Sequence, residues 1–423
     1  MLRINKTGLV CILIFTQIAA FAQNNTNSPY TRYGYGELGN RSFGAGRAMG
    51  GLGYGLRSSK QINPMNPASY SSMDSLTFIF DFGAMAQLSW FDDGTNRQKD
   101  TNGNVEYMAM QFPLSRSLAM SVGLLPFSHV GYSYGTEQTS NGLTYINTYS
   151  GSGGVTELYA GLSYDLWKNR LALGANIGYL FGDVKHDRYS SSSSSGSYPL
   201  SISQRLRVRD LKYDFGIQYT HPLSKTDKIT LGLTFSPKAN LNTTSYTQML
   251  LQYTGSTSET DTIKNPSNAF GLPNSLGFGF TYTRGNKWMV GADVLHEQWG
   301  DAKFFDTKDG FQDRLRVALG GEYIPNIIGR SFLKRMRYRG GLHYSNSYQK
   351  FEVMESQSRE GYKEYGASVG LGLPLIDNRS FLNLSFEYVK ISPDAKFMID
   401  EQYFRFAINY TFNEFWFFKR KVE

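Results

Sequence analysis

Hydrophobic and polar residues alternate along many stretches of this chain of 423 residues. In the segment 403–412, YFRFAINYTF, every second residue is Phe, Ile or Tyr, and Arg, Ala, Asn and Thr stand between them. The segment 314–323, RLRVALGGEY, has the same period and sets Arg314 and Arg316 on the face opposite Leu315. A period of two is typical of a β-strand with one apolar face.

Repeating this comparison along the chain predicts fourteen strands. Short basic turns and longer polar loops alternate between them, as in a membrane barrel with short periplasmic turns and long outer loops. The predicted strands lie near 75–90, 105–114, 117–134, 155–166, 170–189, 201–221, 228–250, 265–284, 286–299, 311–324, 336–349, 361–373, 380–391 and 400–412. We therefore expect an all-β fold, a transmembrane antiparallel β-barrel over residues 75–412, with an aromatic and basic periplasmic tail over 413–423.

The composition favours a membrane barrel over a secreted enzyme. The chain has 29 Tyr, 29 Phe and 44 Gly, and its mean hydropathy is −0.37. In a membrane barrel every second residue faces lipid and the others face a polar lumen, so the average hydropathy stays low. Charges such as Arg314 and Arg316 would be costly against lipid but are acceptable in a lumen.

The first residues predict export. Arg3 and Lys6 precede an apolar run, and Ala20-Phe21-Ala22 matches a signal-peptidase site, so residues 1–22 are expected to be a signal peptide. The only cysteine, Cys11, lies inside that run, so the mature chain has no disulfide and no cysteine-based site. We expect the mature barrel in a bacterial outer membrane.

Residues 23–74 do not alternate and are rich in glycine. Glycine allows close backbone approach, so we expect this segment to fold as a plug inside the lumen. The segment ends in NPMNPASY, and proline fixes its own φ while it holds the preceding residue extended. Asn66, Pro67 and Ala68 are therefore predicted to form the hinge between plug and first strand.

These features together resemble the FadL family of outer-membrane transport barrels. The resemblance rests on the Asn66-Pro67-Ala68 motif after a glycine-rich segment, on fourteen strands, and on a third strand interrupted by Pro126. The pattern GAGRAMGGLGYG is most similar to the Bacteroidetes branch, which includes the type IX secretion shuttle barrel. The resemblance implies uptake of hydrophobic small molecules through a plugged lumen. It also implies a lateral opening into the outer-membrane lipid at Leu125, Pro126 and Phe127.

A second use of the same architecture stays open, that of a non-transporting scaffold or shuttle subunit in a secretion or barrel-assembly complex. A transporter needs an apolar outer pocket, for which the candidates are Met249, Leu250 and Leu251. A scaffold needs a surface for other outer-membrane or periplasmic subunits. The candidates for this surface, in a long turn at the periplasmic rim, are Ile327, Ile328, Phe332 and Leu333.

Catalysis and cofactor binding are not expected. The five histidines are scattered, and His296-Glu297, the best acid–base pair, points to opposite faces of its strand. We expect no metal and no cofactor. Removing residues 1–22 lowers the net charge from +8 to about +6, and the basic residues gather in turns. That pattern favours anionic lipid head groups or a periplasmic partner over nucleic acid.

Overall fold

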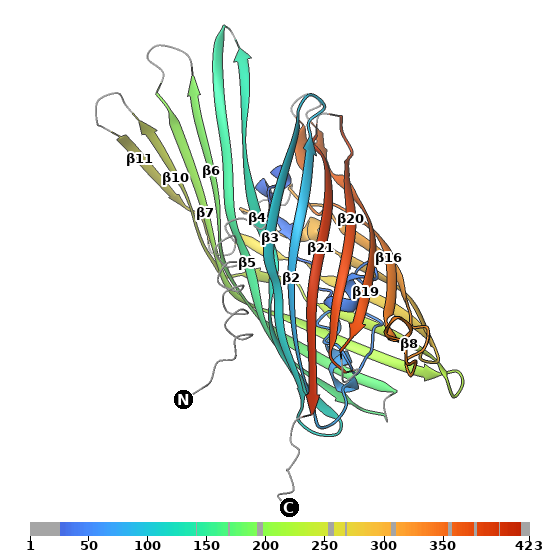
Figure 1. Ribbon diagram of the computed structural model, residues 1–423. Coiled ribbons are helices and arrows are strands. Elements are labelled where there is room, and N and C mark those ends of the chain that lie inside the picture. Colours follow the sequence, from blue (N-terminus) through green and yellow to red (C-terminus); the bar gives the residue numbers. More distant parts are fainter. Residues whose placement is uncertain are drawn as a thin grey trace, which may run out of the picture.

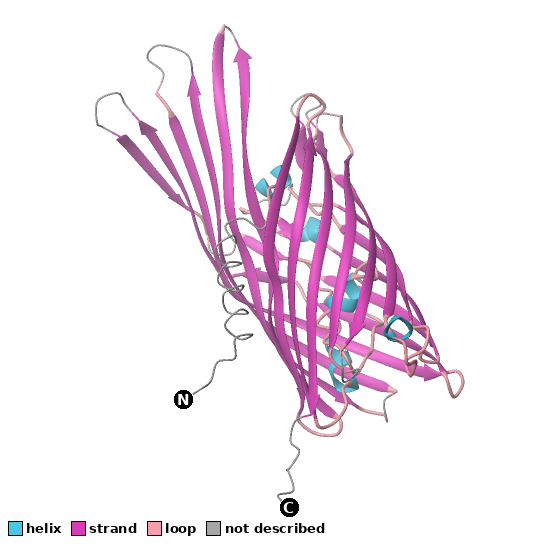
Figure 2. Ribbon diagram, viewed as in Figure 1, coloured by secondary structure: helices cyan, strands magenta, loops and turns pink. Residues whose placement is uncertain are grey.

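The computed structural model is a closed antiparallel β-barrel of fourteen strands (Figures 1 and 2). It describes residues 26–415 apart from 141, 168–169, 193–197, 253–257, 267–268, 306–309, 354–357, 376–378 and 397. The predicted signal peptide and the end of the predicted tail lie outside these residues. β2 and β21 pair along their whole length and close the barrel.

The elements follow the chain from the luminal segment, here residues 26–73, into the wall. The short helical elements are η1 (Pro29–Arg32), α2 (Gly44–Arg47), η2 (Pro67–Ser72), η3 (Trp299–Asp301) and α3 (Phe332–Arg335). The strands are β1 (Glu37–Leu38), β2 (Thr77–Asp92), β3 (Arg97–Pro113), β4 (Leu118–Ser140), β5 (Leu143–Asp165), β6 (Leu171–Ser192), β7 (Leu200–Pro222), β8 (Asp227–Ser236), β9 (Ala239–Leu241), β10 (Thr243–Gln252), β11 (Ser258–Lys264), β12 (Phe270–Leu272), β13 (Ser275–Arg284), β14 (Trp288–Glu297), β15 (Arg314–Tyr323), β16 (Arg337–Asn346), β17 (Phe351–Val353), β18 (Ser358–Glu360), β19 (Tyr362–Pro374), β20 (Phe381–Pro393) and β21 (Asp400–Phe415).

The seventh and eighth wall strands are each interrupted. The continuous strands predicted over 228–250 and 265–284 are wrong in this respect: β8 and β10 form the seventh wall strand, and β11 and β13 form the eighth. Between the halves, β9 and β12 leave the wall and pair with each other. Pro237, Pro266 and Pro273 flank these departures, and proline cannot donate to a ladder in the middle of a sheet.

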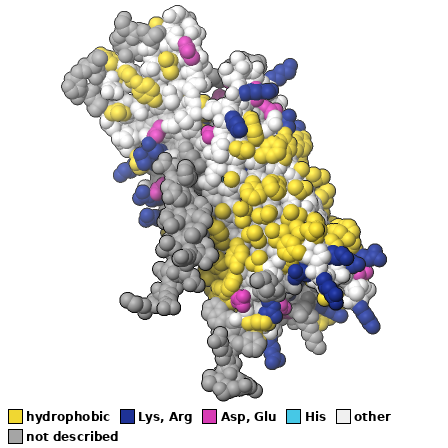
Figure 3. Space-filling view, viewed as in Figure 1, with side chains coloured by type: hydrophobic (Ala, Val, Ile, Leu, Met, Phe, Trp, Pro, Cys, Tyr) yellow, Lys and Arg dark blue, Asp and Glu magenta, His cyan; other side chains and the backbone are white. Residues whose placement is uncertain are grey.

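The outer face of the wall is apolar. Its outward side chains include Leu319, Leu342, Val369 and Phe386, which are all more than half exposed. Figure 3 shows hydrophobic side chains gathered over one face of the barrel, with Lys and Arg near its ends. Among the described residues no helix is long and apolar enough to cross a membrane. The strands carry the lipid-facing surface, and the protein belongs in the bacterial outer membrane.

The luminal segment lies inside the barrel. Its side chains Tyr35, Met49 and Tyr70 are fully buried. The segment starts beside the loops at the long-loop end, where the Tyr30 hydroxyl donates to the Ile399 carbonyl at 2.6 Å. It ends at the short-turn end, where η2 leads into β2. The barrel therefore holds one continuous stretch of chain along its length.

One part of the wall extends beyond the rest and turns away from it (Figure 1). This part, here called the leaf, consists of β4 above Ser128, β5 above Val155, β6 above Gly182, β7 above Val208, and β10 with β11. These boundary residues form one paired row: Ser128–Val155, Val155–Gly182, Gly182–Val208 and Val208–Thr243. Gly182 in that row has a φ value of 156°, and Gly153 and Gly154 next to the row have φ values of 107° and 155°. Only glycine adopts such values readily, so the sheet can bend sharply there.

Candidate functional site

The wall has a seam between β3 and β4. The two strands pair only between Met108–Leu124 and Pro113–Ala119, at the short-turn end. Above that point β4 pairs with β5 alone in the wall, and its register with β5 shifts between Pro126 and Ser128. Since Pro126 has no N–H, a bulge here is the expected response.

The luminal segment fills the lower part of this seam. β1 takes the place of β3 beside β4, with Glu37 opposite His129 and Leu38 opposite Ser128. The Gly39 N–H donates to the Phe127 carbonyl at 2.8 Å. The seam is thus closed at this height by two residues of strand from inside the barrel.

The residues predicted for a lateral opening do not all lie together. Pro126 and Phe127 line the cavity beside β1. Leu125 is 1% exposed and packs below them with Ile62 and Tyr159 in a buried cluster. The structure therefore brings two of the three residues to the seam, and Leu125 belongs to the core.

A cavity of about 190 Å³ separates the luminal segment from the wall. Apolar side chains line it next to the seam and under the long-loop end, including Leu38, Phe127 and Trp299. Its charged lining residues are Glu37, Arg41, Arg47, Glu106, Lys212, Asp214, Asp293, Glu297, Arg314, Arg316, Glu364, Glu387 and Arg405. Among the described residues no group of three or more His, Cys, Asp or Glu could hold a metal ion. Both signs of charge are present in nearly equal number, so the charges around the cavity nearly cancel.

Ion pairs join the luminal segment to the wall across this cavity. Arg41 donates to Asp214 at 2.8 Å and to Glu157 at 3.3 Å. Burial lowers the pKa of Arg41, but these two carboxylates outweigh burial and raise that pKa above its usual value.

Two further arginines, Arg47 and Arg405, form ion pairs nearer the seam. Arg47 is 3% exposed and pairs with Glu106, and Arg405 of β21 donates to Glu37 at 2.6 Å. Glu387 lies 3.8 Å from Arg47 and 3.7 Å from Arg405. Buried charges paired in this way fix the position of the segment, because moving either partner leaves an unpaired charge.

The Asn66-Pro67-Ala68 motif anchors the segment at the short-turn end. The Asn66 side chain caps η2 by accepting from the Ala68 N–H, and it donates to the Tyr54 carbonyl at 2.9 Å and to the Ile217 carbonyl at 3.2 Å. Asn66 thus contacts the wall and another part of the segment at once. The hinge role predicted for the motif stays a prediction, and its contacts are those of an anchor.

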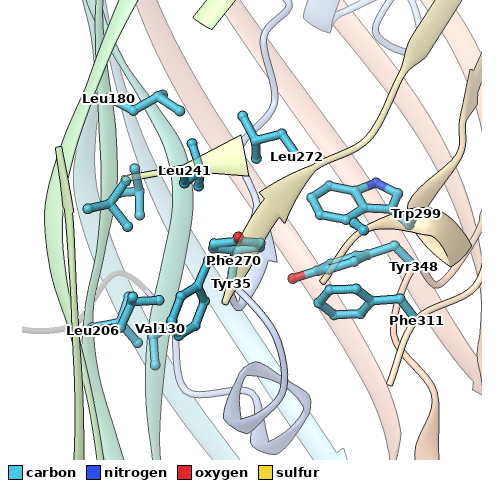
Figure 4. Packing of buried hydrophobic residues seen from close by; sticks show 14 of the residues in the cluster. Tyr35, Val130, Leu180, Leu206, Leu241, Phe270, Leu272, Trp299, Phe311 and Tyr348 are labelled. Carbon is cyan, nitrogen blue, oxygen red and sulfur yellow. The ribbon is translucent and has the colours of Figure 1, made fainter. Parts of the chain in front are cut away.

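An aromatic cluster covers the lumen at the long-loop end (Figure 4). Tyr35 of the luminal segment, Phe270 of β12 and Trp299 of η3 come from three different parts of the chain, and Phe311 and Tyr348 pack beside Trp299. The Tyr35 hydroxyl donates to the Gly271 carbonyl at 3.1 Å, and burial raises the pKa of this phenol. The inward departure of β9 and β12 therefore supplies part of the cover.

The candidate outer pocket is divided by the pleat of β10. Met249 pairs with Ile202, and Leu251 pairs with Leu200, on one face of the leaf. Leu250 lies on the opposite face, because neighbouring residues of a strand alternate. None of the three lines the cavity.

The candidate partner surface at the short-turn rim is largely exposed. Ile328, Leu333 and Phe332 are 89%, 62% and 46% exposed, and Ile327 is half-buried in the same turn. Such a group of apolar side chains differs from the basic short turns elsewhere at this end.

Sequence reasoning missed β1 and the β9–β12 pair. Glu37-Leu38 lies in a glycine-rich stretch with no alternation, so nothing in it signals a strand. The prolines on either side of β9 and β12 are a signal that could have indicated their departure from the wall.

Comparison with known proteins decides the family. The model of one family, BamG, matches residues 3–423. The chain belongs to the BamG family. No curated protein sequence matches the chain.

Solved structures with a similar fold are FadL-type barrels. The Pseudomonas putida toluene transporter TodX is 15% identical, covers 90% of this chain and 100% of its own, and has a TM-score of 0.60. The Ralstonia pickettii toluene transporter TbuX is 14% identical, with coverages of 88% and 98% and a TM-score of 0.57. A Pseudomonas aeruginosa FadL homologue is 12% identical, with coverages of 89% and 99% and a TM-score of 0.57. At these identities the likeness establishes that this BamG-family chain has the FadL-type fold.

Proposed function

We propose that the protein is a membrane-anchored scaffold subunit, which binds other envelope proteins and does not pass small molecules through its lumen. The observation that carries the proposal is the contrast between a lumen filled by a closely packed segment and a leaf that extends beyond the barrel with charged side chains on its outer face. A scaffold needs a rigid anchor and a free surface, whereas a channel needs a segment that can move.

The contacts of the luminal segment support the proposed role of the barrel as a rigid anchor. Wall and segment approach so closely that a Cβ on Gly232 would lie 1.8 Å from the Tyr54 carbonyl oxygen, and a Cβ on Gly341 would lie 2.2 Å from the Met49 carbonyl carbon. Sliding the segment along the wall would drive backbone into side chains at such positions. The ion pairs of Arg41 and Arg47 oppose the same movement.

The side chains of the leaf support its proposed role as a surface that binds other proteins. Its outer face carries charged side chains, with Arg207 2.7 Å from Asp183 and Lys185 2.5 Å from Asp187. Such a face is suited to water and not to the bilayer core. Its inner face carries apolar side chains above the aromatic cluster, including Ile202 and Met249. The exposed rim at Ile328 and Leu333 offers a second surface on the other side of the membrane.

A second candidate function is uptake of a hydrophobic small molecule, and one observation favours it. The cavity reaches Pro126 and Phe127, where β3 and β4 no longer pair and, among the described residues, β1 takes the place of β3 beside β4. If β1 withdrew, the cavity would open sideways toward lipid. The toluene transporters share this fold.

Native mass spectrometry of the protein extracted from its own outer membrane at native expression separates the two functions. The scaffold proposal predicts a stable assembly with other envelope proteins at fixed stoichiometry and no small-molecule adduct. A lone barrel with a reproducible lipid-sized adduct would overturn it. If that adduct is lost in Phe127→Ser but kept in the matched core-facing variant Leu125→Val, uptake at the seam is the better account.

A further inference from the structure

The edge of β4 in the leaf carries backbone groups without partners. The N–H and C=O of Gly131 both face away from β5, since each contacts the Thr31 hydroxyl, at 3.2 Å and 3.1 Å. Alternation along an antiparallel ladder places the backbone groups of Ser133, Gly135 and Glu137 on the same edge. Within the part of the chain that the structure describes, no backbone group pairs with them, because the ladder with β3 ends far below.

The lower part of the same edge already accepts an added strand. β1 pairs there with Ser128 and His129, although it is only two residues long and comes from inside the barrel. The stretch above it, residues 131–139 with the sequence GYSYGTEQT, contains no proline and no lysine. Proteins that keep an edge strand unpaired usually blunt it with such residues. This edge is therefore open to a further strand.

We propose that an extended segment of a second envelope protein adds to β4 along residues 133–139 and continues the sheet of the leaf. Main-chain hydrogen bonds then supply the affinity, and the side chains on either face supply the selectivity. The inference rests on the proposed scaffold function and identifies the surface that performs it.

The side chains beside this edge indicate the chemistry of the added strand. On the inner face, Arg32 donates to the Tyr134 hydroxyl at 3.0 Å and lies over the Tyr149 ring at 3.9 Å. It has no carboxylate partner among the described residues. On the outer face the neighbouring residues are Ser133 and Glu137. A fitting strand carries an acidic residue among apolar ones on its inner face, and polar residues on its outer face.

The test compares two double variants, of which one lacks two backbone N–H donors at the edge and the other keeps them. Ser133→Pro with Glu137→Pro removes two N–H groups from the edge, and Ser133→Ala with Glu137→Ala removes the same side chains but keeps those groups. The ladder with β5 survives in both, because these N–H groups point away from it. The full-length protein is expressed at native level, extracted in mild detergent and measured by native mass spectrometry, with the barrel's resistance to unheated detergent gels as the folding control.

The proposal predicts that the alanine pair keeps the wild-type assembly, whereas the proline pair retains about tenfold less partner, since two backbone hydrogen bonds are lost. Equal assembly in both pairs would overturn strand addition and leave the scaffold function standing. Absence of any assembly in the wild type would overturn the scaffold function itself.

The chain's own β3 is the competing occupant. Continuing the β3–β4 register upward from Met108–Leu124 would set Lys99 opposite Ser133. A disulfide that forms in the membrane between Lys99→Cys and Ser133→Cys, in most of the molecules, would overturn the proposal, because β3 would then occupy the edge. Absence of that disulfide, together with the alanine–proline difference, supports the added strand.

Discussion

The wall around the luminal segment and the leaf belong to one sheet, yet their residues have opposite surroundings. Around the segment, inward side chains are buried and paired, as for Arg47 with Glu106. In the leaf, the same strands carry half-exposed apolar residues inward and charges such as Arg207 outward. This difference is the basis of our proposal that the lower wall is a fixed anchor and that the leaf binds a partner.

We expect the largest loss of stability from a substitution where the luminal segment and the wall approach most closely. Gly341→Ala places a Cβ against the Met49 backbone and should lower the free energy of unfolding by about 3 kcal/mol or more, because backbone cannot move aside easily. Urea unfolding in detergent measures this change in the free energy of unfolding. The neighbouring Gly340→Ala is the matched control, since a Cβ there meets nothing closer than 3.8 Å. Similar losses in both variants would contradict a tight luminal fit.

We expect the next largest loss of stability from removing one partner of the buried ion pair between Arg47 and Glu106. Arg47→Met leaves Glu106 and Glu387 without that cation and should cost about 3 kcal/mol of unfolding free energy. Adding Glu106→Gln to the same variant should recover part of the loss, because one uncompensated charge is then gone. A full set of unfolding curves for single and double variants checks this, and an unchanged stability in Arg47→Met would show that the pair does not hold the segment.

The anchor at the short-turn end should have a smaller effect. Asn66→Ala loses the cap of η2 and two hydrogen bonds, so we expect a loss of about 1–2 kcal/mol. Limited proteolysis between residues 56 and 66 provides a second readout, because a released anchor exposes this stretch. Resistance equal to that of the wild type would mean that Pro67 alone fixes the turn.

The leaf should tolerate change without loss of stability. Leu251→Ser alters a half-exposed residue of its inner face and should change the unfolding free energy by less than about 0.5 kcal/mol. Leu250→Ser on the other face is the control. Only the inner-face variant should weaken the assembly with envelope proteins. A large loss of stability in Leu251→Ser would show that the leaf's inner face already has its partner within the chain.

Where strands cross the bilayer, the pattern of residues was sufficient to predict them. β7 and β14 follow the expected bounds within a few residues, because lipid on one side and a polar lumen on the other enforce alternation. β3 begins at Arg97 and not near 105, and β5 begins at Leu143 and not near 155. Outside the bilayer neither face of a strand meets lipid, so RQKDTNGN over 97–104 has no reason to alternate between apolar and polar residues.

The candidate site could be predicted only in part, for physical reasons. Pro126 has no N–H, so a bulge in β4 follows from the sequence alone. The strand that covers the seam could not be predicted, because Glu37-Leu38 pairs through backbone groups that every residue except proline carries. The ion pairs of the lumen join residues as distant as Glu37 and Arg405, and no local pattern connects them. The type IX relationship and the lateral opening stay predictions.

The measurement that tests the account most directly is amide hydrogen exchange, by mass spectrometry, of the protein alone and of the protein in the assembly extracted from its own membrane. A fixed luminal segment and a leaf that binds a strand predict equal protection of residues 43–56 in both samples. They predict protection of residues 133–139 in the assembly only. Exchange at 43–56 that changes between the samples, or exchange at 133–139 that does not, would contradict the account.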